Sequence, residues 1–438
     1  MSSARSSADA TPAPWRAWLM VALLFMFMFL NYADKSVIGL AGPQIRKDLD
    51  LSYAAFGDIG SSFFYLFAIS SILGGFVANR LPARWLLLGM AVIWSLTQFP
   101  MMGTVGIGTL VACRVLLGAG EGPAYPVALH AIYKWFPDNR RTLPTSLLVL
   151  GAGVGTAVSG LVLPAVIQRW DWHAAFVAVG LAGLIWAVAW FLLGREGPIE
   201  DRVHPAAAPS GERVPYRHLL TCPTMIGIFI ACFGAYWAIA VGLVWGYSYM
   251  IQAAHLDPLS AGRVAVIPTV ISIFLAPAIG WLSQHLMQRG VPSRFSRGAL
   301  GCIGLVLGAL GIAGMALMDG VAAKIAFYSF AASISFVIYT VAPPIIAEIT
   351  PGRQRGAMLA INNAVYSCAG ILAPSIMGRV VDASADPIAG YRNGYLLLAA
   401  ILAGCGMLGL VLIDPARDRR RFAALARGPA AEHLSLAD

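Results

Sequence analysis

Twelve apolar stretches, each about 20 residues or longer, recur along the chain and constrain its fold more than any other feature. A helix of this length spans the hydrocarbon core of a bilayer, and short polar segments separate the stretches. Only 12% of the 438 residues are charged, against about 25% in a soluble domain. The expected spans are 17–41, 54–78, 85–105, 107–130, 144–167, 174–194, 223–251, 263–287, 297–317, 322–347, 357–381 and 392–413.

The positions of Lys and Arg predict the orientation of these spans, because short cytoplasmic loops are enriched in them. Of the 30 Lys and Arg residues, 21 fall in segments on the side of the termini. Seven fall on the opposite side, and Lys35 and Arg114 fall within spans. Both termini are therefore expected in the cytoplasm of a cell with a bacterial-type inner membrane. The basic residues are scattered over many loops, so the net charge of +9 predicts no nucleic-acid partner.

The order of the segments predicts two related halves. Six spans, a basic polar linker and six further spans follow one another, and "YKWFPDNRRTLPTSL" after the fourth span resembles "AEITPGRQRGAMLA" after the tenth. Transporters built from parallel repeats bind their substrate between the halves. The expected parts are a cytoplasmic tail, a six-helix bundle, a cytoplasmic linker, a second six-helix bundle and a basic cytoplasmic tail, at 1–16, 17–194, 195–222, 223–413 and 414–438.

Four charged residues fall well inside the expected spans: Asp34, Lys35, Arg114 and Glu121. Each costs about 2.5–3.5 kcal/mol on insertion scales, so a partner, a cavity or a function is expected for each. At about 1.5 Å per residue, Asp34 lies roughly 27 Å and Arg114 roughly 30 Å from the inner face. Glu121 lies about 10 Å closer to the cytoplasm than Arg114, which places Arg114, Gly118, Glu121 and Tyr125 on one helical stripe left open at the glycine.

Asp34 and Lys35 point about 100° apart around their helix. We therefore expect Asp34 to face Arg114 and Lys35 to face a central cavity. The alternative is a static network that joins spans one and four, although apolar packing often stabilises a core equally well. Because burial disfavours an ionised carboxyl group, Glu121 is expected to take up a proton and to release it when the cavity opens inward.

Other polar residues are candidates for the substrate path. They are Tyr65, Tyr236, Ser335, Tyr339, Asn362 and Asn363. Adjacent asparagines in an apolar helix are costly unless they are paired. They therefore bind either substrate hydroxyl groups or a neighbouring helix, and the sequence does not distinguish these roles.

Four segments carry a resemblance to a known family: "NYADKSVIGLAGPQI" (31–45), "RVLLGAGEGPAYPVALHAIYKWFP" (114–137), "RWDWHAAFVAVG" (169–180) and "NNAVYSCAGILAPSIMGRVVD" (362–382). The chain resembles the major facilitator superfamily and, within it, the anion:cation symporters. The resemblance implies an all-α membrane protein with the major facilitator fold. It further implies that Asp34 and Glu121 couple transport to protons, and that Lys35 and Arg114 serve anion recognition or gating.

The sequence thus predicts a secondary active transporter, acting as a monomer, that imports a small organic anion with protons by alternating access. A sugar acid or related carboxylate is favoured, and an aromatic carboxylate is the alternative substrate. A drug/proton antiporter is the alternative function, but the glycine-rich fifth span lacks the adjacent Gly-Pro pair of many exporters. No metal-ligand spacing, phosphate-binding loop or nucleophile–base pair is found, so no cofactor and no enzyme activity are expected.

Overall fold

Helices form all the regular structure in the part of the chain that the structure describes. The computed structural model describes residues 14–78, 81–137, 140–199, 214–351 and 354–427. Residues 1–13 and 428–438 of the expected terminal tails and residues 200–213 of the expected linker therefore lie outside the described residues. The first half contains α1 (Pro14–Asp48), α2 (Tyr53–Ala78), α3 (Ala83–Leu96), η1 (Phe99–Met102), α4 (Ile107–Glu121), α5 (Ala124–Tyr133), α6 (Thr142–Arg169) and α7 (Trp172–Leu193).

The second half repeats this order. A short helix, α8, precedes it in the expected linker. The elements are α8 (Tyr216–Thr221), α9 (Pro223–Gln252), α10 (Pro258–Gln288), η3 (Arg294–Ala299), α11 (Leu300–Leu317), α12 (Val321–Ser335), α13 (Ile338–Ile349), α14 (Arg355–Asp382), α15 (Pro387–Leu412) and α16 (Pro415–Arg427).

Eleven described helical segments are long and apolar enough to cross a membrane. The remaining expected span, 107–130, is present as two shorter helices, α4 and α5, which Gly122 and Pro123 separate. Proline lacks the backbone N–H that a continuous helix would use at this position. The described helices, together with this broken one, confirm the expected all-α membrane fold.

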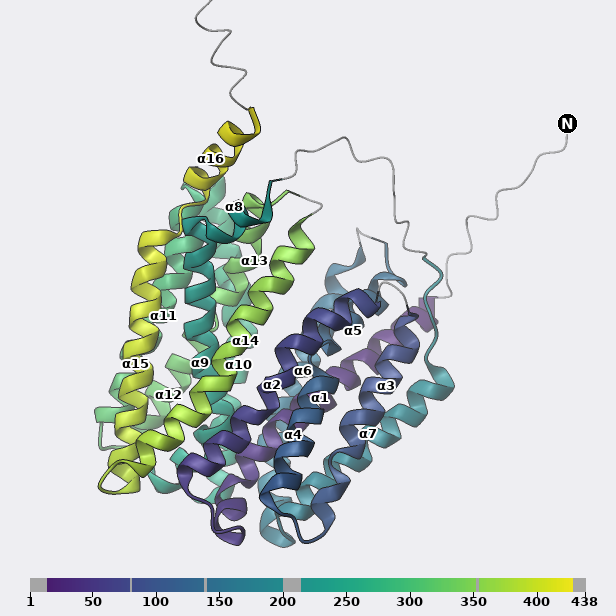
Figure 1. Cartoon of the computed structure of the whole chain (residues 1–438), viewed down its shortest axis with the longest axis vertical. Coiled ribbons are helices and arrows are strands. Elements are labelled where there is room, and N and C mark those ends of the chain that lie inside the picture. The colour runs from purple at the N-terminus through teal and green to yellow at the C-terminus, as the bar shows by residue number, and fades with distance from the viewer. Residues whose placement is uncertain (1–13, 79–80, 138–139, 200–213, 352–353, 428–438) are drawn as a thin grey trace, which may run out of the picture.

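The two bundles stand side by side in Figure 1, the first in purple to teal and the second in teal to yellow. Their fourth crossings are both broken, as α4–α5 and as α12–α13. The side chains of Asp171 and Asp386 cap the last helices of the two halves, α7 and α15, by accepting backbone N–H groups. These shared features confirm two six-helix pseudo-repeats.

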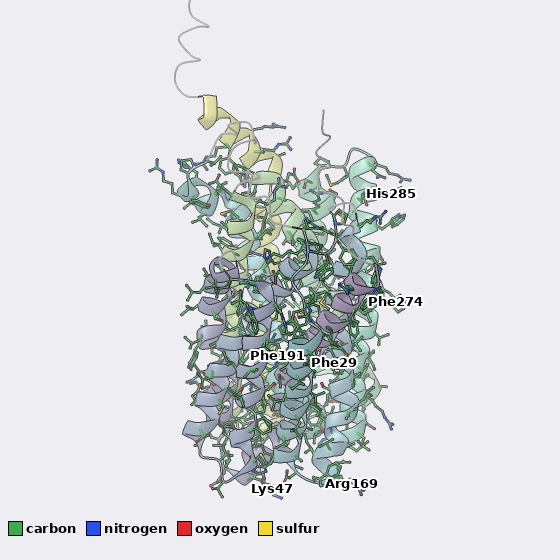
Figure 2. The ribbon with its side chains drawn as sticks, turned by 90° about the vertical axis from the view of Figure 1, so that its right-hand side faces the viewer. Phe29, Lys47, Arg169, Phe191, Phe274 and His285 are labelled. Atoms are coloured by element: carbon green, nitrogen blue, oxygen red, sulfur yellow. The ribbon has the colours of Figure 1, made fainter. Side chains whose placement is uncertain are left out.

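The outer surface of the bundles is apolar. Ile185, Phe274 and Val411 are 71%, 73% and 69% exposed, which suits contact with lipid tails rather than with water. Figure 2 shows Phe274 on the outside of the bundle, between His285 near one end and Arg169 near the other. The ends of the molecule thus carry charge, and the band between them is apolar.

Contacts between the halves gather toward the end opposite the chain termini, which we call the far end. Here the carboxylate of Asp382 on α14 accepts hydrogen bonds from the backbone N–H groups of Tyr53 (3.0 Å) and Ala54 (2.7 Å) at the start of α2. Asp58 on α2 forms an ion pair with Arg379 on α14 (3.1 Å). A side chain of the second half thus caps a helix of the first half. These contacts close the far end.

The opposite end, from which the termini emerge, is called the terminal end. Of the hydrogen bonds between described residues of the two halves, the one nearest this end joins Asn363 to Ser71 (3.0 Å). Beyond it the bundles diverge in Figure 1. Tyr32 and Tyr125, which lie within electrostatic range of each other, are 37% and 42% exposed. The molecule is therefore closed at the far end and open toward the terminal end.

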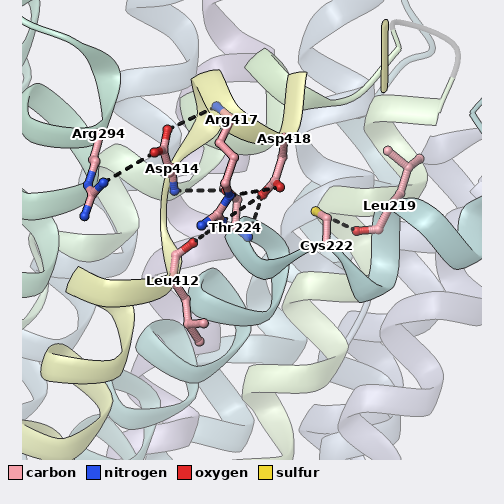
Figure 3. A network of polar contacts seen from close by, with 8 residues as sticks. All are labelled: Leu219, Cys222, Thr224, Arg294, Leu412, Asp414, Arg417 and Asp418. Carbon is pink, nitrogen blue, oxygen red and sulfur yellow. Dashed lines mark hydrogen bonds and ion pairs between the residues drawn. The ribbon is translucent and has the colours of Figure 1, made fainter. Parts of the chain in front are cut away.

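A polar network anchors α16 to the second half at the terminal end (Figure 3). The carboxylate of Asp418 accepts from the backbone N–H of Thr224 (2.9 Å), and Asp414 pairs with Arg294 (3.4 Å). Burial of Asp418 raises its pKa, but hydrogen bonds from Arg417 and Thr224 outweigh this effect and hold the pKa below its usual value. Asp418 therefore stabilises the start of α9 as an ionised cap.

Candidate functional site

The helix α4 contributes both an arginine and a glutamate to the interior of the first half. Arg114 and Glu121 are 2% and 1% exposed. Between them, a Cβ on Gly118 would meet the carbonyl oxygen of Phe63 at 1.8 Å, so α2 passes directly over this glycine. The expectation of a stripe left open at Gly118 is therefore wrong, because backbone of α2 fills the space. The break after Glu121 also places Tyr125 on a separate helix, α5.

Lys35 and Glu121 form an ion pair between α1 and α4. The Nζ atom of Lys35 lies 3.2 Å from Oε2 of Glu121, and the two side chains are 13% and 0% exposed. Lys35 also donates to Oδ1 of Asn31, one turn earlier on α1 (2.6 Å), and lies over the ring of Tyr32 at 4.5 Å. Because both charges are largely withdrawn from water, removing either one would leave the other buried and unpaired.

Asp34 and Arg114 are also nearly inaccessible, at 1% and 2% exposed. They are within electrostatic range of each other, but no ion pair between described residues joins them. Oδ1 of Asp34 instead accepts a hydrogen bond from Nε2 of Gln98, which lies between α3 and η1 (3.1 Å). The guanidinium of Arg114 lies over the ring of Phe63 at 4.9 Å.

The expected arrangement of these four charges is therefore realised only in part. Lys35 turns toward Glu121 because its long side chain reaches across to α4. Asp34, about 100° further around α1, points toward α3 instead. Lys35 is the more exposed of the two interior cations, with 13% side-chain exposure against 2% exposure for Arg114.

The other candidate residues divide into three groups. Tyr65 is 45% exposed and faces away from the packed core. Tyr339 donates to the carbonyl oxygen of Cys232 (2.9 Å), and Asn363 lies between Ser71 and the hydroxyl of Tyr366. Two candidates lie apart from Lys35, inside the second bundle: Ser335 donates to Ala331 beside Gly308, and Asn362 lies beside Cys232.

Aromatic rings of the second half gather opposite the Lys35–Glu121 pair. The ring of Tyr366 lies 5.0 Å from that of Tyr236 and 5.3 Å from that of Tyr339. Tyr236 is within electrostatic range of Tyr32 and Glu121 across the interface. The hydroxyl groups of Tyr339 and Tyr366 bind groups of their own half. These residues therefore present rings, rather than free hydroxyl groups, to the space between the halves.

Two polar residues of the site, Asn31 and Gln98, were not among the expected candidates. Asn31 precedes Lys35 by one turn, a spacing that indicates a shared helix face. Gln98 is an uncharged residue two positions before Pro100, where a helix break is expected. The helical spacing of Asn31 and the proline near Gln98 could have indicated both residues. They were missed because they are neutral, and the interpretation of the sequence depended on charged residues.

A cavity of about 580 Å³ lies elsewhere, between α10 and α12. Its lining is apolar apart from Ser329 and Ser333, and it includes no charged residue. A smaller cavity of about 10 Å³ adjoins Arg114, Gln98 and Thr97. Among the described residues no cluster of His, Cys, Asp or Glu could hold a metal ion. The charged site on α1 and α4 is therefore the candidate functional site.

Known sequences include a family model and several transporters that are similar to this chain. The model of the Major Facilitator Superfamily matches residues 24–343. The chain is 28% identical to a hexuronate transporter of Bacillus subtilis, with 90% of this chain and 93% of that protein covered. It is 25% identical to a probable galactarate/D-glucarate transporter of the same organism, with 93% and 95% covered. A probable sulfoacetate transporter of Cupriavidus necator is 24% identical, with 91% and 94% covered.

Solved structures share the fold. A bacterial homolog of the human lysosomal transporter Spinster superposes with a TM-score of 0.78 at 16% identity, covering 94% of this chain and 99% of that one. A D-xylose–proton symporter superposes with a TM-score of 0.73 at 16% identity, covering 92% and 99%. The arrangement of helices is therefore shared with these membrane proteins across nearly the whole chain.

Proposed function

The chain belongs to the Major Facilitator Superfamily and is a membrane transporter, and we propose that it imports a small organic anion, a sugar acid or related carboxylate, together with protons. The relatives named for hexuronate, galactarate/D-glucarate and sulfoacetate support an anionic substrate. The excess of Lys and Arg on the side of the termini supports a cytoplasmic terminal end. The proposed location is a bacterial-type inner membrane, with both termini inside and the protein acting as a monomer.

The observation that carries this proposal is the buried ion pair between Lys35 and Glu121. In the absence of substrate, the ammonium group of Lys35 is held by the carboxylate of Glu121. A substrate carboxylate competes with Glu121 for the same cation. Proton uptake by Glu121 removes its charge and releases Lys35 to the substrate, so proton and anion binding favour each other.

The closed far end and open terminal end support alternating access around this site. In the proposed cycle, proton and anion bind while the far end is open, and the halves then rock to the conformation described here. Water reaching Glu121 from the cytoplasm favours its ionised form. The ionised Glu121 then forms its ion pair with Lys35 again and displaces the substrate. Asp34 and Arg114 link this exchange to the neighbouring elements, Asp34 through its hydrogen bond from Gln98 and Arg114 through its contact with Phe63 on α2.

A second substrate class, aromatic carboxylates, is favoured by the rings of Tyr236, Tyr339 and Tyr366. Stacking against such rings contributes about 0.5–1.5 kcal/mol beyond buried area. Competition assays that pair hexuronates with benzoate derivatives distinguish the two classes. The class that displaces the other at lower concentration is the substrate class.

The direct test is uptake of labelled carboxylates into proteoliposomes under an imposed pH gradient. Wild-type protein should accumulate at least one acid against its gradient, and dissipating the gradient should abolish accumulation. A protein that instead expels cationic drugs in exchange for protons would be an antiporter. If the pH gradient drives accumulation of none of the acids tested, the proposal is contradicted.

Glu121→Gln tests the coupling role, because glutamine mimics the protonated acid but cannot release a proton. This variant should lose accumulation and retain substrate binding and exchange between pre-loaded vesicles. The matched control is Glu196→Gln, which removes an acid that also pairs with a lysine, Lys134 (2.6 Å), but lies beyond the end of α7. Accumulation at the wild-type level by Glu121→Gln would assign coupling to another group.

A further inference from the structure

A break in the third crossing of the membrane places an amide beside the buried carboxylate. α3 ends at Leu96, and the short helix η1 restarts the chain at Phe99. Gln98 lies in this break with 2% exposure. On its other side, a Cβ on Gly180 of α7 would meet the Cβ of Gln98 at 2.9 Å. Gln98 is thus packed between α7 and the charged site. Because α7 occupies one side of it, its side chain extends toward the charged site.

That direction is toward Asp34. Nε2 of Gln98 donates to Oδ1 of Asp34 at 3.1 Å. The other carboxylate oxygen, Oδ2, is buried with no hydrogen-bond partner among the described residues. A donor that binds an ionised carboxylate stabilises the ionised form and fixes the orientation of the group. Gln98 therefore turns Asp34 toward α3.

The guanidinium of Arg114 lacks the partners that its burial requires. Its Nε, Nη1 and Nη2 atoms are buried, and none has a hydrogen-bond partner among the described residues. Leaving such donors unsatisfied costs about 1–3 kcal/mol each, and more for a charged group. Phe63 covers one face of the group, but a ring face does not replace hydrogen-bond acceptors in the guanidinium plane.

The small cavity beside Arg114 supplies a place for such an acceptor. Its volume of about 10 Å³ is close to the minimum for one water molecule. Arg114, Gln98 and Thr97, whose side chains are polar, are among its lining residues, and a buried water molecule commonly makes about three hydrogen bonds. The cavity therefore has both the size and the polar partners that an ordered water molecule needs.

We propose that Gln98 is a positioning residue for Asp34 and that one water molecule in this cavity joins Gln98 to Arg114. The water accepts from the guanidinium and donates to Oε1 of Gln98, whose Nε2 holds Asp34. In this state the two buried charges are thus linked through an amide and a water molecule rather than by direct contact. The role of Gln98 in coupling rests on the proposed function, whereas the water site and the hydrogen bond do not.

The water site is tested by a high-resolution structure of the wild-type protein in lipid nanodiscs with the far end closed. A density peak within hydrogen-bonding distance of both Arg114 and Gln98 is expected. Gln98→Met, which keeps the approximate size of the side chain and removes the amide, should lose this peak. An empty cavity, or a direct bond between Arg114 and Asp34 in the wild type, would overturn the proposal.

The positioning role is tested by separating transport rate from substrate affinity. Gln98→Met should slow proton-driven uptake about 10- to 100-fold, the factor expected for loss of a hydrogen bond to a charged group, and leave substrate affinity unchanged. Gln98→Glu should recover uptake only at acid pH, where its carboxyl group is protonated and donates to Asp34. Lys35, Arg114 and Glu121 also face this region, so the pH profile is compared with that of Glu121→Gln.

Gln44→Met is the matched control, because Gln44 is a part-buried glutamine of α1 whose amide donates to Ile167, away from the charged site. It should change neither rate nor pH profile. Equal rates for Gln98→Met and wild type would exclude the positioning role. If the wild-type protein accumulates no acid, the proposed function fails, and the density still decides the water site.

Discussion

The first half contains two lysine–glutamate ion pairs, and their surroundings differ. Lys35 and Glu121 lie inside the membrane-spanning part with 13% and 0% side-chain exposure. Lys134 and Glu196 form a comparable pair at the terminal end, with 16% and 33% exposure. The outer pair joins two helix ends, whereas the inner pair is largely withdrawn from water and is therefore less screened by salt.

Lys35→Gln is expected to weaken carboxylate binding about 10- to 100-fold, because a hydrogen bond to a charged group contributes about 1.5–3 kcal/mol. Substrate-induced thermal shifts over a concentration series measure the affinity. Lys134→Gln removes an equal charge outside the site and should leave the affinity unchanged. Equal losses in both variants would indicate a general effect of charge rather than recognition by Lys35.

At the residue scale, the sequence predicted the four buried charges because a charge in an apolar span is costly and therefore conspicuous. It did not predict which acid pairs with which base. That choice depends on the reach of each side chain and on Asn31 and Gln98, which are neutral. The roles of Asp34, Lys35, Arg114 and Glu121 in transport stay predictions, as do those of Tyr65, Ser335, Tyr339, Asn362 and Asn363.

At the element scale, α2 and α4 pack so closely that a single methyl group is excluded. Gly118→Ala would place a carbon 1.8 Å from the carbonyl oxygen of Phe63, and overpacking of this kind costs about 1–3 kcal/mol or more. We expect a lower Tm and a disturbed Lys35–Glu121 pair. Gly108→Ala, on the same helix with no atom within 4 Å of the added carbon, is the control and should leave the Tm unchanged.

The breaks in the helices could not be predicted from the length of the apolar stretches alone. Most of the continuous spans were predicted to within about five residues at each end, since a run of apolar residues indicates both the type and the extent of a helix. The first helix, α1, instead continues to Asp48, seven residues beyond its expected end at 41. The interruption after Glu121 was missed, although Gly122 and Pro123 stand at it. Prolines occur inside α10 and α14 without ending them, so proline alone does not determine where a membrane helix breaks.

At the scale of the whole molecule, Asp382 holds the two halves together at the far end. Asp382→Asn keeps the shape of the side chain, but its amide nitrogen cannot accept a hydrogen bond. One of the two bonds from the backbone N–H groups of Tyr53 and Ala54 is therefore lost, at a cost of about 1 kcal/mol. The equilibrium should shift toward conformers open at the far end. Distances between spin labels on α5 and α13 should accordingly shorten in a larger fraction of molecules.

Asp386→Asn is the control for this change. Asp386 caps α15 within its own half by accepting from Ala389 (2.9 Å), so its loss should not alter the balance between conformers. An unchanged distance distribution in Asp382→Asn would show that the ion pair of Asp58 with Arg379 and the packing of α2 on α14 suffice to close the far end.

The closure of only one end also determines where the membrane voltage acts. If the terminal end faces the cytoplasm, water entering there carries the cytoplasmic potential up to the Lys35–Glu121 pair. The voltage then falls mainly across the thin layer between that pair and the far end, instead of across the full thickness of the bilayer. A proton leaving Glu121 toward the cytoplasm would cross little of the field. The roughly 2.3 kcal/mol per charge per 100 mV would instead act on the rocking step that carries the loaded site past this layer.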